Sequence, residues 1–335
     1  MNFWQNKKIL VTGGAGFIGS RVAIKLVQAG ANVRVVDNLS KGESINLENI
    51  LDKIEFKQLN LLNTENAEKS MEGIDVCFHF AAIIGGIGYF HKYPATSVRD
   101  NSILNLNLWD ASKKEKTKIV CLSSSMVFER ASVFPTPEKA IETSPPPLTG
   151  YGFSKLVSEY IAKTYFEEFG VPYVIARPFN AYGPGEVPGD YIGYSHIIPD
   201  LVKKILSGQY PLEILGSGDQ TRSYTYVDDL ADAIIFIAEK AENDDFNIGT
   251  GIETSVKELA EKIWKICRTE KEIKFKNLSA LQYDVQKRVP DISKITALGW
   301  KPKVDLDTGL GITVDWLKKR LSIYPAKEPK PQEIL

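Results

Sequence analysis

The sequence predicts an α/β fold, a doubly wound parallel sheet with a smaller lobe toward the C-terminus. Three observations predict it. Short β-branched runs alternate with segments of helical period, a glycine-rich turn follows the first run, and 335 residues exceed the usual size of one hydrophobic core. Parallel neighbours need crossover helices, so this alternation favours a parallel sheet covered on both faces.

The predicted strands are short apolar runs rich in Val and Ile. They occupy residues 8–12, 32–36, 54–57, 75–79, 118–122 and 173–176, and a returning strand occupies residues 245–249. Apolar residues recur at helical spacing between these runs, which predicts helices over residues 18–30, 97–113, 151–169 and 226–241.

Each of the two parts is predicted to be built from two pieces of chain. Residues 180–193 are rich in Gly, Pro and Tyr, which indicates a loop where the sheet gives way to the second lobe. We expect the sheet domain to hold residues 1–178 and 223–250, and the lobe to hold residues 179–222 and 251–325. Residues 326–335, with prolines among charges, are expected to form a mobile tail.

Charge and composition exclude several classes of protein. The 41 basic and 42 acidic side chains give a net charge of -1, so there is no electrostatic case for binding nucleic acid or an anionic membrane. No apolar run approaches the roughly 20 residues that span a bilayer, and the N-terminus lacks a signal peptide. Cys77, Cys121 and Cys267 are scattered, which favours a reducing, cytoplasmic location and predicts no metal site.

A glycine-rich turn follows the first predicted strand and opens a helix. Gly14, Gly16 and Gly19 satisfy the pattern G-x-G-x-x-G, and Gly13, Gly16 and Gly19 satisfy G-x-x-G-x-x-G. Without side chains, this turn lets a pyrophosphate approach the backbone. The helix N-terminus then offers N–H donors and the positive end of its dipole.

Asp37 lies 18 residues beyond Gly19, at the end of the second predicted strand. A carboxylate at this place binds both ribose hydroxyls and repels the 2′-phosphate of NADP, so NAD is the predicted cofactor. A structural turn with a capping Asp is the alternative. Strand, turn, helix and acid in this order favour a Rossmann dinucleotide site.

Tyr151 and Lys155 are spaced so that they share one face of a predicted helix. A phenol of ordinary pKa is a poor base at neutral pH, and a nearby ammonium is expected to lower the pKa of Tyr151 toward the working range. Ser123, Ser124 and Ser125 follow the fifth strand at its carboxyl end, where such sheets bind ligands. A hydroxyl there can hydrogen-bond a substrate oxygen. Y-x-x-x-K alone is common by chance and gains weight from the glycine turn.

Further motifs extend this pattern along nearly the whole chain. The set comprises residues 12–19, 37–40, 79–82, 101, 123–125, 151–155, 177–184, 216–229 and 298–300. By this ordered set the chain resembles the extended short-chain dehydrogenase/reductases of the nucleotide-sugar epimerase/dehydratase family. Members commonly pair helices into a four-helix dimer interface, so the resemblance implies a homodimer through the helices near residues 101–113 and 151–169.

The resemblance implies roles for individual residues. Tyr151 would be the base, Lys155 would hold the nicotinamide ribose and Ser124 would assist. The implied cofactor-binding residues are Gly13, Gly16, Phe17, Ile18, Gly19, Asp37, Asn38, Asn60, Leu61, Ala81, Ala82, Asn101, Tyr151 and Lys155. A nucleotide-diphosphate sugar would contact Gly86, Ser125, Met126, Asn180, His196, Arg222 and Arg288. The two arginines suit a diphosphate, and surface ion pairs are their alternative role.

The resemblance also bears on the reaction. Dehydratases of the family usually carry Asp-Glu straight after the active-site Ser or Thr, where this chain has Ser125 and Met126, and a thioether cannot do acid–base work. Decarboxylases likewise usually carry a glutamate nearby. Both reactions are therefore disfavoured, and C4 epimerisation of a UDP-sugar through a 4-keto intermediate is the predicted function.

Two segments keep other reactions open. Residues 83–89 resemble the glycine-rich loop of GDP-mannose 3,5-epimerase and GDP-fucose synthase, and residues 195–199 resemble the synthase segment that supplies a histidine acid. Those enzymes pair the acid with a cysteine where this chain has Met126, so His196 is either an acid toward one carbon or only a contact. A GDP-sugar 3,5-epimerase, a 4-keto reductase and a 4-dehydrogenase are the alternatives. A non-catalytic dinucleotide-binding protein is the alternative from another class.

Overall fold

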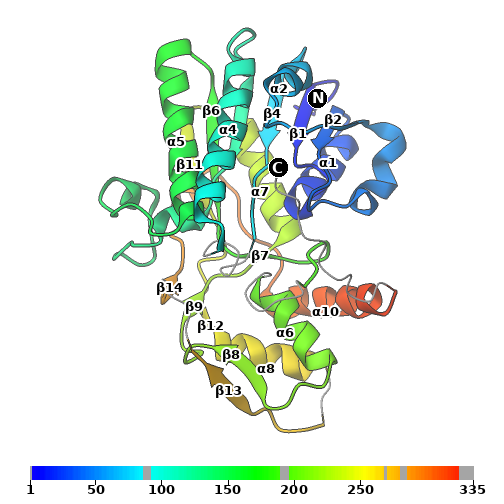
Figure 1. The fold of residues 1–335 in the computed structure, drawn as a ribbon, viewed down its shortest axis with the longest axis vertical. Helices are drawn as coiled ribbons and strands as arrows, with labels where there is room; N and C mark the ends of the chain where they lie inside the picture. The colour runs from blue at the N-terminus through cyan, green and yellow to red at the C-terminus, as the bar shows by residue number, and fades with distance from the viewer. Residues whose placement is uncertain (1, 86–91, 189–195, 268–269, 280–284, 324–335) are drawn as a thin grey trace.

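The computed structural model describes residues 2–85, 92–188, 196–267, 270–279 and 285–323 (Figure 1). Gly86 and the predicted tail, residues 326–335, lie outside the described residues. A sheet flanked by helices forms the upper part of the molecule in Figure 1, and a smaller lobe hangs below it. No helix within the described ranges is both long enough and apolar enough to cross a bilayer.

The central sheet has seven parallel strands in the order β11-β6-β5-β4-β1-β2-β3. Their bounds are β1 (Lys8–Thr12), β2 (Asn32–Asp37), β3 (Glu55–Gln58), β4 (Val76–His79), β5 (Lys118–Leu122), β6 (Tyr173–Pro178) and β11 (Asp244–Ile248). This confirms the predicted doubly wound parallel sheet. The order reverses at β1, which has β2 on one side and β4 on the other, so successive crossovers leave in opposite directions from this point.

Predicted and observed strand ends agree closely where the local run of apolar residues ends with the strand. β1 and β5 have the predicted bounds, whereas β6 continues two residues further, to Pro178. The extension arises because β11 pairs with β6 up to Ile248 opposite Pro178. A distant segment of chain therefore sets this strand end, and local propensity does not show it.

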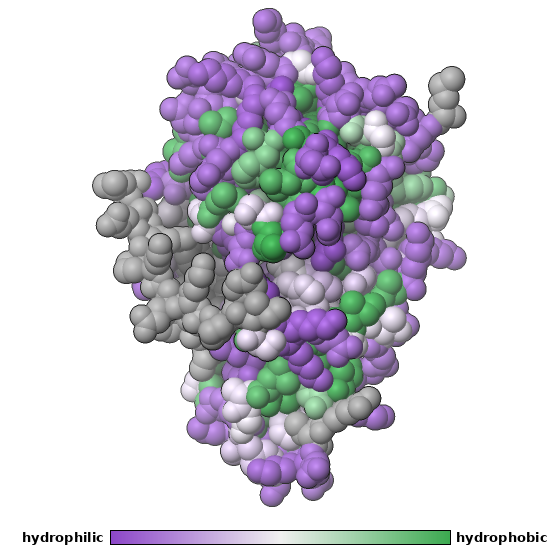
Figure 2. Space-filling view, turned by 90° about the vertical axis from the view of Figure 1, so that its right-hand side faces the viewer, coloured by the Kyte–Doolittle hydropathy of each residue, from purple (hydrophilic) through white to green (hydrophobic). Residues whose placement is uncertain are grey.

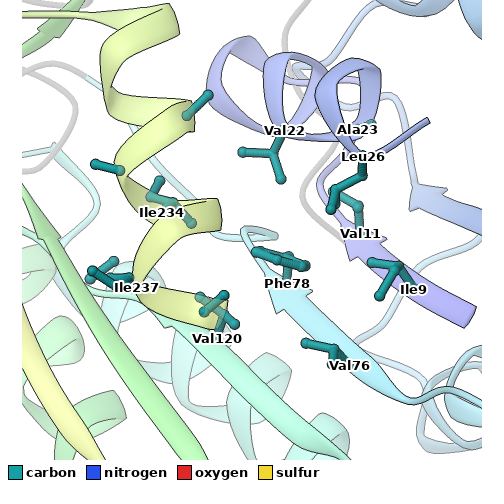
Figure 3. Packing of buried hydrophobic residues seen from close by; sticks show 14 of the residues in the cluster. Ile9, Val11, Val22, Ala23, Leu26, Val76, Phe78, Val120, Ile234 and Ile237 are labelled. Atoms are coloured by element: carbon teal, nitrogen blue, oxygen red, sulfur yellow. The ribbon is translucent and has the colours of Figure 1, made fainter. Parts of the chain in front are cut away.

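Helices cover both faces of the sheet. Helices α1 (Phe17–Gln28) and α7 (Val227–Lys240) cover one face, while α2 (Thr64–Met71), α4 (Pro94–Ser112) and α5 (Gly150–Phe169) cover the other. Alternate residues of β1 supply the two cores, because side chains along a strand point to opposite faces. Ile9 and Val11 pack with Val22 of α1 and Ile234 of α7 (Figure 3), and Leu10 packs in the core on the opposite face.

The lower lobe has a core of its own. It contains α6 (Ile197–Leu206), β8 (Leu212–Leu215), α8 (Val256–Ile266), β13 (Phe275–Leu278) and α10 (Leu306–Ile323). Short strands join it to the sheet domain: β7 (Ala181–Tyr182) pairs with β10 (Thr225–Tyr226), and β9 (Thr221–Arg222) lies between β12 (Thr254–Ser255) and β14 (Lys287–Arg288). Figure 2 shows that hydrophilic residues cover most of one side of the molecule, with smaller apolar areas among them.

Candidate active site

A cavity of about 720 Å³ lies where residues at the carboxyl ends of the central strands face residues of the lower lobe. Gly13, Asp37 and Leu122, which end or follow β1, β2 and β5, form part of its wall, and His196 of the lobe forms another part. The position agrees with the rule that open α/β sheets bind ligands where their strand order reverses.

The glycine turn between β1 and α1 is fixed by close backbone contacts. Gly13 has φ +66°, and a Cβ there would lie 2.7 Å from the backbone nitrogen of Ala81. A Cβ on Gly19 would lie 2.3 Å from the Gly13 carbonyl oxygen. Any side chain at either position would therefore push the turn, the helix and the wall at Ala81 apart.

The N-terminus of α1 is open toward the cavity. Its N-cap residue is Gly16, and within the described part of the chain no side-chain hydrogen bond caps this end of the helix. Gly16, Phe17, Ile18 and Gly19 all line the cavity, so backbone N–H groups of a twelve-residue helix are available to an anionic ligand. The sequence prediction of a phosphate cradle fits this geometry.

Asp37 ends β2 as a buried carboxylate in the cavity wall. Its Oδ2 accepts a hydrogen bond from the Ala15 N–H at 3.0 Å, and its Oδ1 accepts one from the Leu39 N–H at 2.8 Å. Burial raises the pKa of Asp37, and these two backbone N–H groups lower it in part. The carboxylate is thus fixed beside the glycine turn, where a ribose bound to that turn would meet it.

The remaining predicted cofactor residues lie at two depths. Asn38, Asn60, Leu61, Ala81 and Ala82 all line the cavity. Asn101 lies behind this wall and is 2% exposed. Its side chain accepts from the Ile83 N–H at 2.7 Å and donates to the Ile83 carbonyl at 3.1 Å, so in this structure Asn101 positions the wall.

Tyr151 lies in the first turn of α5 and lines the same cavity with 5% of its surface exposed. Thr149 caps this helix by accepting from the Gly152 N–H at 3.1 Å. Glu129 holds the cap in place because its Oε2 accepts from the N–H groups of Leu148 and Thr149 and from the Thr149 hydroxyl. Glu129 therefore positions the N-cap of α5, and no pattern in the sequence singles it out.

The structure contradicts the prediction that Lys155 lowers the pKa of Tyr151. Burial raises the pKa of Tyr151 to about 12, while a hydrogen bond with Ser124 and the charge of Arg288 act in the lowering direction. The Lys155 Nζ lies 5.9 Å from the centre of the phenol ring and donates to the Leu122 carbonyl at 2.7 Å. The two side chains do share one site, but this geometry leaves the phenol protonated.

A buried ion network supports the catalytic face of α5. Glu159, one turn beyond Lys155, accepts hydrogen bonds from Ser123 and from the Nε and Nη2 of Arg177, the latter two both at 2.7 Å. Arg177 also pairs with Asp245 at 2.5 Å. The network therefore ties α5 to the ends of β5 and β6 and to β11.

Residues 9–249 match the model of a family described as the NAD dependent epimerase/dehydratase family. This chain belongs to that family. The open helix N-terminus, the fixed carboxylate and the Tyr151–Lys155 pair fit its cofactor, NAD. The match covers the whole central sheet and both predicted motifs, and it confirms the resemblance seen in the sequence.

Named relatives differ in their reactions. A putative UDP-glucose 4-epimerase of Methanocaldococcus jannaschii is 35% identical over 317 residues, 92% of this chain and 98% of that protein. UDP-glucuronic acid decarboxylase 1 of Xenopus tropicalis is 31% identical over 333 residues, 98% of this chain and 76% of that protein. The family is therefore shared across two kinds of reaction.

Solved structures share this fold over nearly the whole chain. UDP-glucose 4-epimerase of Thermotoga maritima, solved with UDP-glucose, is 36% identical with a TM-score of 0.84, covering 94% of this chain and 99% of that one. UDP-N-acetylglucosamine 4-epimerase of Methanobrevibacter ruminantium, in complex with UDP-N-acetylmuramic acid, is 29% identical with a TM-score of 0.85 and the same coverage.

The residues predicted to contact substrate are brought together only in part. Arg222 of β9 and Arg288 of β14 are partners in register on parallel strands, so the two guanidinium groups lie on the same face. Asn180 donates from its side-chain amide to the Ser223 carbonyl at 3.0 Å. Of this predicted set, His196 lines the cavity described above. Gly86 lies outside the described residues.

Sequence reasoning missed several charged residues of the cavity wall. Glu186 bonds the Nδ1 of His196, and Lys41 donates to the Ile84 carbonyl at 3.1 Å. Lys319 and Arg320 reach the wall from α10, near the other end of the chain. Lys41 could have been noticed as a cation four residues beyond Asp37, whereas nothing in the sequence places α10 at this cavity.

Proposed function

We propose that this protein is an NAD-dependent epimerase that inverts C4 of a UDP-sugar through a transient 4-keto intermediate. The observation that carries the proposal is the surroundings of Tyr151. The Tyr151 hydroxyl is hydrogen-bonded to the Ser124 side chain. Met126 and Ile84 are apolar neighbours that pack against Tyr151. Among the residues that the structure describes, this small cluster of Tyr151, Met126 and Ile84 holds one base and no second acid, which suits oxidation and reduction at one carbon.

The residues of the chain would act as follows. Tyr151 would take the proton of the C4 hydroxyl, and Ser124 would hold the same oxygen through its hydroxyl. When bound, the oxidised nicotinamide ring supplies a hydride acceptor and a positive charge. A positive charge near the phenol would lower the pKa of Tyr151 from its raised value, because it favours the phenolate. Tyr151 would return its proton to the C4 oxygen as the hydride is restored to the opposite face of C4, and this would complete the epimer.

The lower lobe is the proposed nucleotide-sugar site. Strand β9 lies between β12 and β14 where the two parts of the molecule join, and β9 and β14 carry Arg222 and Arg288. A pair of guanidinium groups suits a diphosphate, since each can donate two parallel hydrogen bonds. The relatives named as UDP-sugar enzymes support a UDP-sugar as the substrate class.

Product analysis tests the reaction. UDP-glucose, UDP-glucuronate, UDP-N-acetylglucosamine and GDP-mannose are each incubated with the protein in D2O and followed by NMR and mass spectrometry. We expect a C4 diastereomer of a UDP-sugar without deuterium, since the hydride returns to the carbon it left. Deuterium at C3 or C5 would assign the protein to the 3,5-epimerase alternative, and loss of CO2 from UDP-glucuronate would show a decarboxylase.

We further propose a homodimer through α4 and α5, and a cytoplasmic location. The two helices pack against each other and carry large apolar side chains that are exposed in the single chain: Ile103, Leu106, Phe153, Tyr160 and Phe166. Sedimentation velocity should show a dimer for the wild type. Phe153→Glu together with Tyr160→Glu should give monomers, because charges would enter an apolar interface. A wild type that sediments as a monomer at micromolar concentration contradicts this interface.

A further inference from the structure

Helix α10 forms part of the cavity wall although it lies outside the family match. The match ends at residue 249, and α10 spans Leu306–Ile323. Trp316, Lys319 and Arg320 of this helix line the same cavity as the glycine turn and Asp37. Figure 1 shows α10 extending from the lower lobe on the side of the molecule where α1 and β2 lie.

The contact of α10 with the sheet domain identifies which end of the cavity it closes. Arg320 Nη2 pairs with Glu43 Oε2 at 2.5 Å. Glu43 follows Gly42, whose backbone is so close to Asp37 that a Cβ there would lie 3.0 Å from Asp37 Oδ2. The helix therefore reaches the side of the cavity bounded by the ribose-binding carboxylate, which is the adenosine end of a dinucleotide.

The loop that carries Glu43 is fastened to the glycine turn. The Glu43 N–H donates to the Ala15 carbonyl at 3.1 Å, and the Asn46 side-chain amide donates to the same oxygen at 2.9 Å. Ala15 in turn donates its N–H to Asp37 at 3.0 Å. An ion pair on Glu43 thus connects α10 to the backbone that would hold the cofactor phosphates.

The other end of the connection is rigid as well. Leu310, Val314 and Leu317 anchor α10 in the core of the lower lobe, each with 0% exposure. Arg320 stands in the last turn of the helix, where a cation is favoured by the helix dipole, and its side chain is 17% exposed against 47% for Glu43. The pair therefore joins two firmly held elements in the wall of the cavity.

We propose that α10 is part of the cofactor site, with Trp316, Lys319 and Arg320 closing its adenosine end and the Arg320–Glu43 ion pair slowing the release of NAD. This inference rests on the proposed function, because an epimerase regenerates its cofactor within each cycle and needs no exchange. Release requires α10 and the loop at residues 42–46 to separate, and the ion pair opposes this separation.

The test measures release of isotope-labelled NAD from the intact protein into an excess of unlabelled NAD. We expect Arg320→Met and Glu43→Gln each to release NAD about fivefold faster than the wild type, the effect of losing one partly exposed ion pair. The double variant Glu43→Arg with Arg320→Glu should restore slow release. Raised salt should speed release from the wild type and leave Arg320→Met unchanged, since salt screens the pair.

A second ion pair on the same helix provides the matched control. Asp307 of α10 pairs with Lys262 of α8 at 2.9 Å, and neither residue lines the cavity. Asp307→Asn should leave the release rate unchanged. Equal release rates in the wild type, Arg320→Met and Glu43→Gln would overturn the proposed role of α10 and leave the proposed function untouched. A wild type that binds no NAD would overturn the cofactor assignment and the proposed function with it.

Discussion

Replacing Tyr151 with Phe should reduce kcat by about 10³-fold, within the usual range for losing a general base, while NAD still binds. The phenol oxygen is the group that would take the sugar proton, and Phe keeps the ring that packs against Met126 and Ile84. Steady-state kinetics on the accepted UDP-sugar measures the loss. Calorimetry with NAD shows that the cofactor site is intact.

Two comparisons make the Tyr151 result specific. Tyr210→Phe changes an exposed tyrosine of the lower lobe that lines neither the cavity nor the proposed dimer interface, and it should retain full activity. Because burial raises the pKa of Tyr151, the wild-type kcat/KM should rise with pH across the neutral range as the phenolate fraction grows. A Phe variant with more than a tenth of wild-type turnover would remove Tyr151 from its role as the base.

Arg177→Met should destabilise the fold by roughly 3–5 kcal/mol, the usual cost of breaking a buried ion pair. Arg177 is fully buried, and its removal would leave Glu159, which is 1% exposed, without its cation. Asp245 would lose a partner at the same time. Urea unfolding followed by circular dichroism measures the change in the free energy of unfolding.

An exposed pair shows what burial adds to this effect. Lys69 and Glu65 pair at 2.8 Å on the surface of α2, with 57% and 70% exposure, so Lys69→Met should leave the free energy of unfolding nearly unchanged. Glu159→Met combined with Arg177→Met should recover part of the loss, because no uncompensated carboxylate then remains at Glu159. If Arg177→Met costs no more than Lys69→Met, the network does not hold the sheet and α5 together.

Much of the site could be predicted because its signals are local. The glycine turn, Asp37 and the Tyr151–Lys155 pair each depend on spacing within one strand, turn or helix. The short apolar runs and the helical patterns between them then place these pieces at the carboxyl edge of one sheet. Residue type and spacing therefore carried the fold class, the cofactor and the candidate base.

The sequence alone could not give what depends on distant segments meeting. It indicated that Lys155 would lower the pKa of Tyr151, but burial, which is a product of packing, raises that pKa. The sequence did not predict a role for Glu159, which depends on its hydrogen bonds with Arg177 and Ser123. It also did not predict the contact between Arg320 of α10 and Glu43, which are 277 positions apart in the chain.

The sequence by itself determined the parallel sheet and the dinucleotide turn, because short-range sterics and periodicity fix them, and its ordered motifs indicated the family by resemblance. Only the tertiary structure decided the protonation of the base, the support behind it and the wall formed by α10. Desolvation and ion pairing act between groups that the chain brings together after it has folded, and spacing along the sequence does not record them.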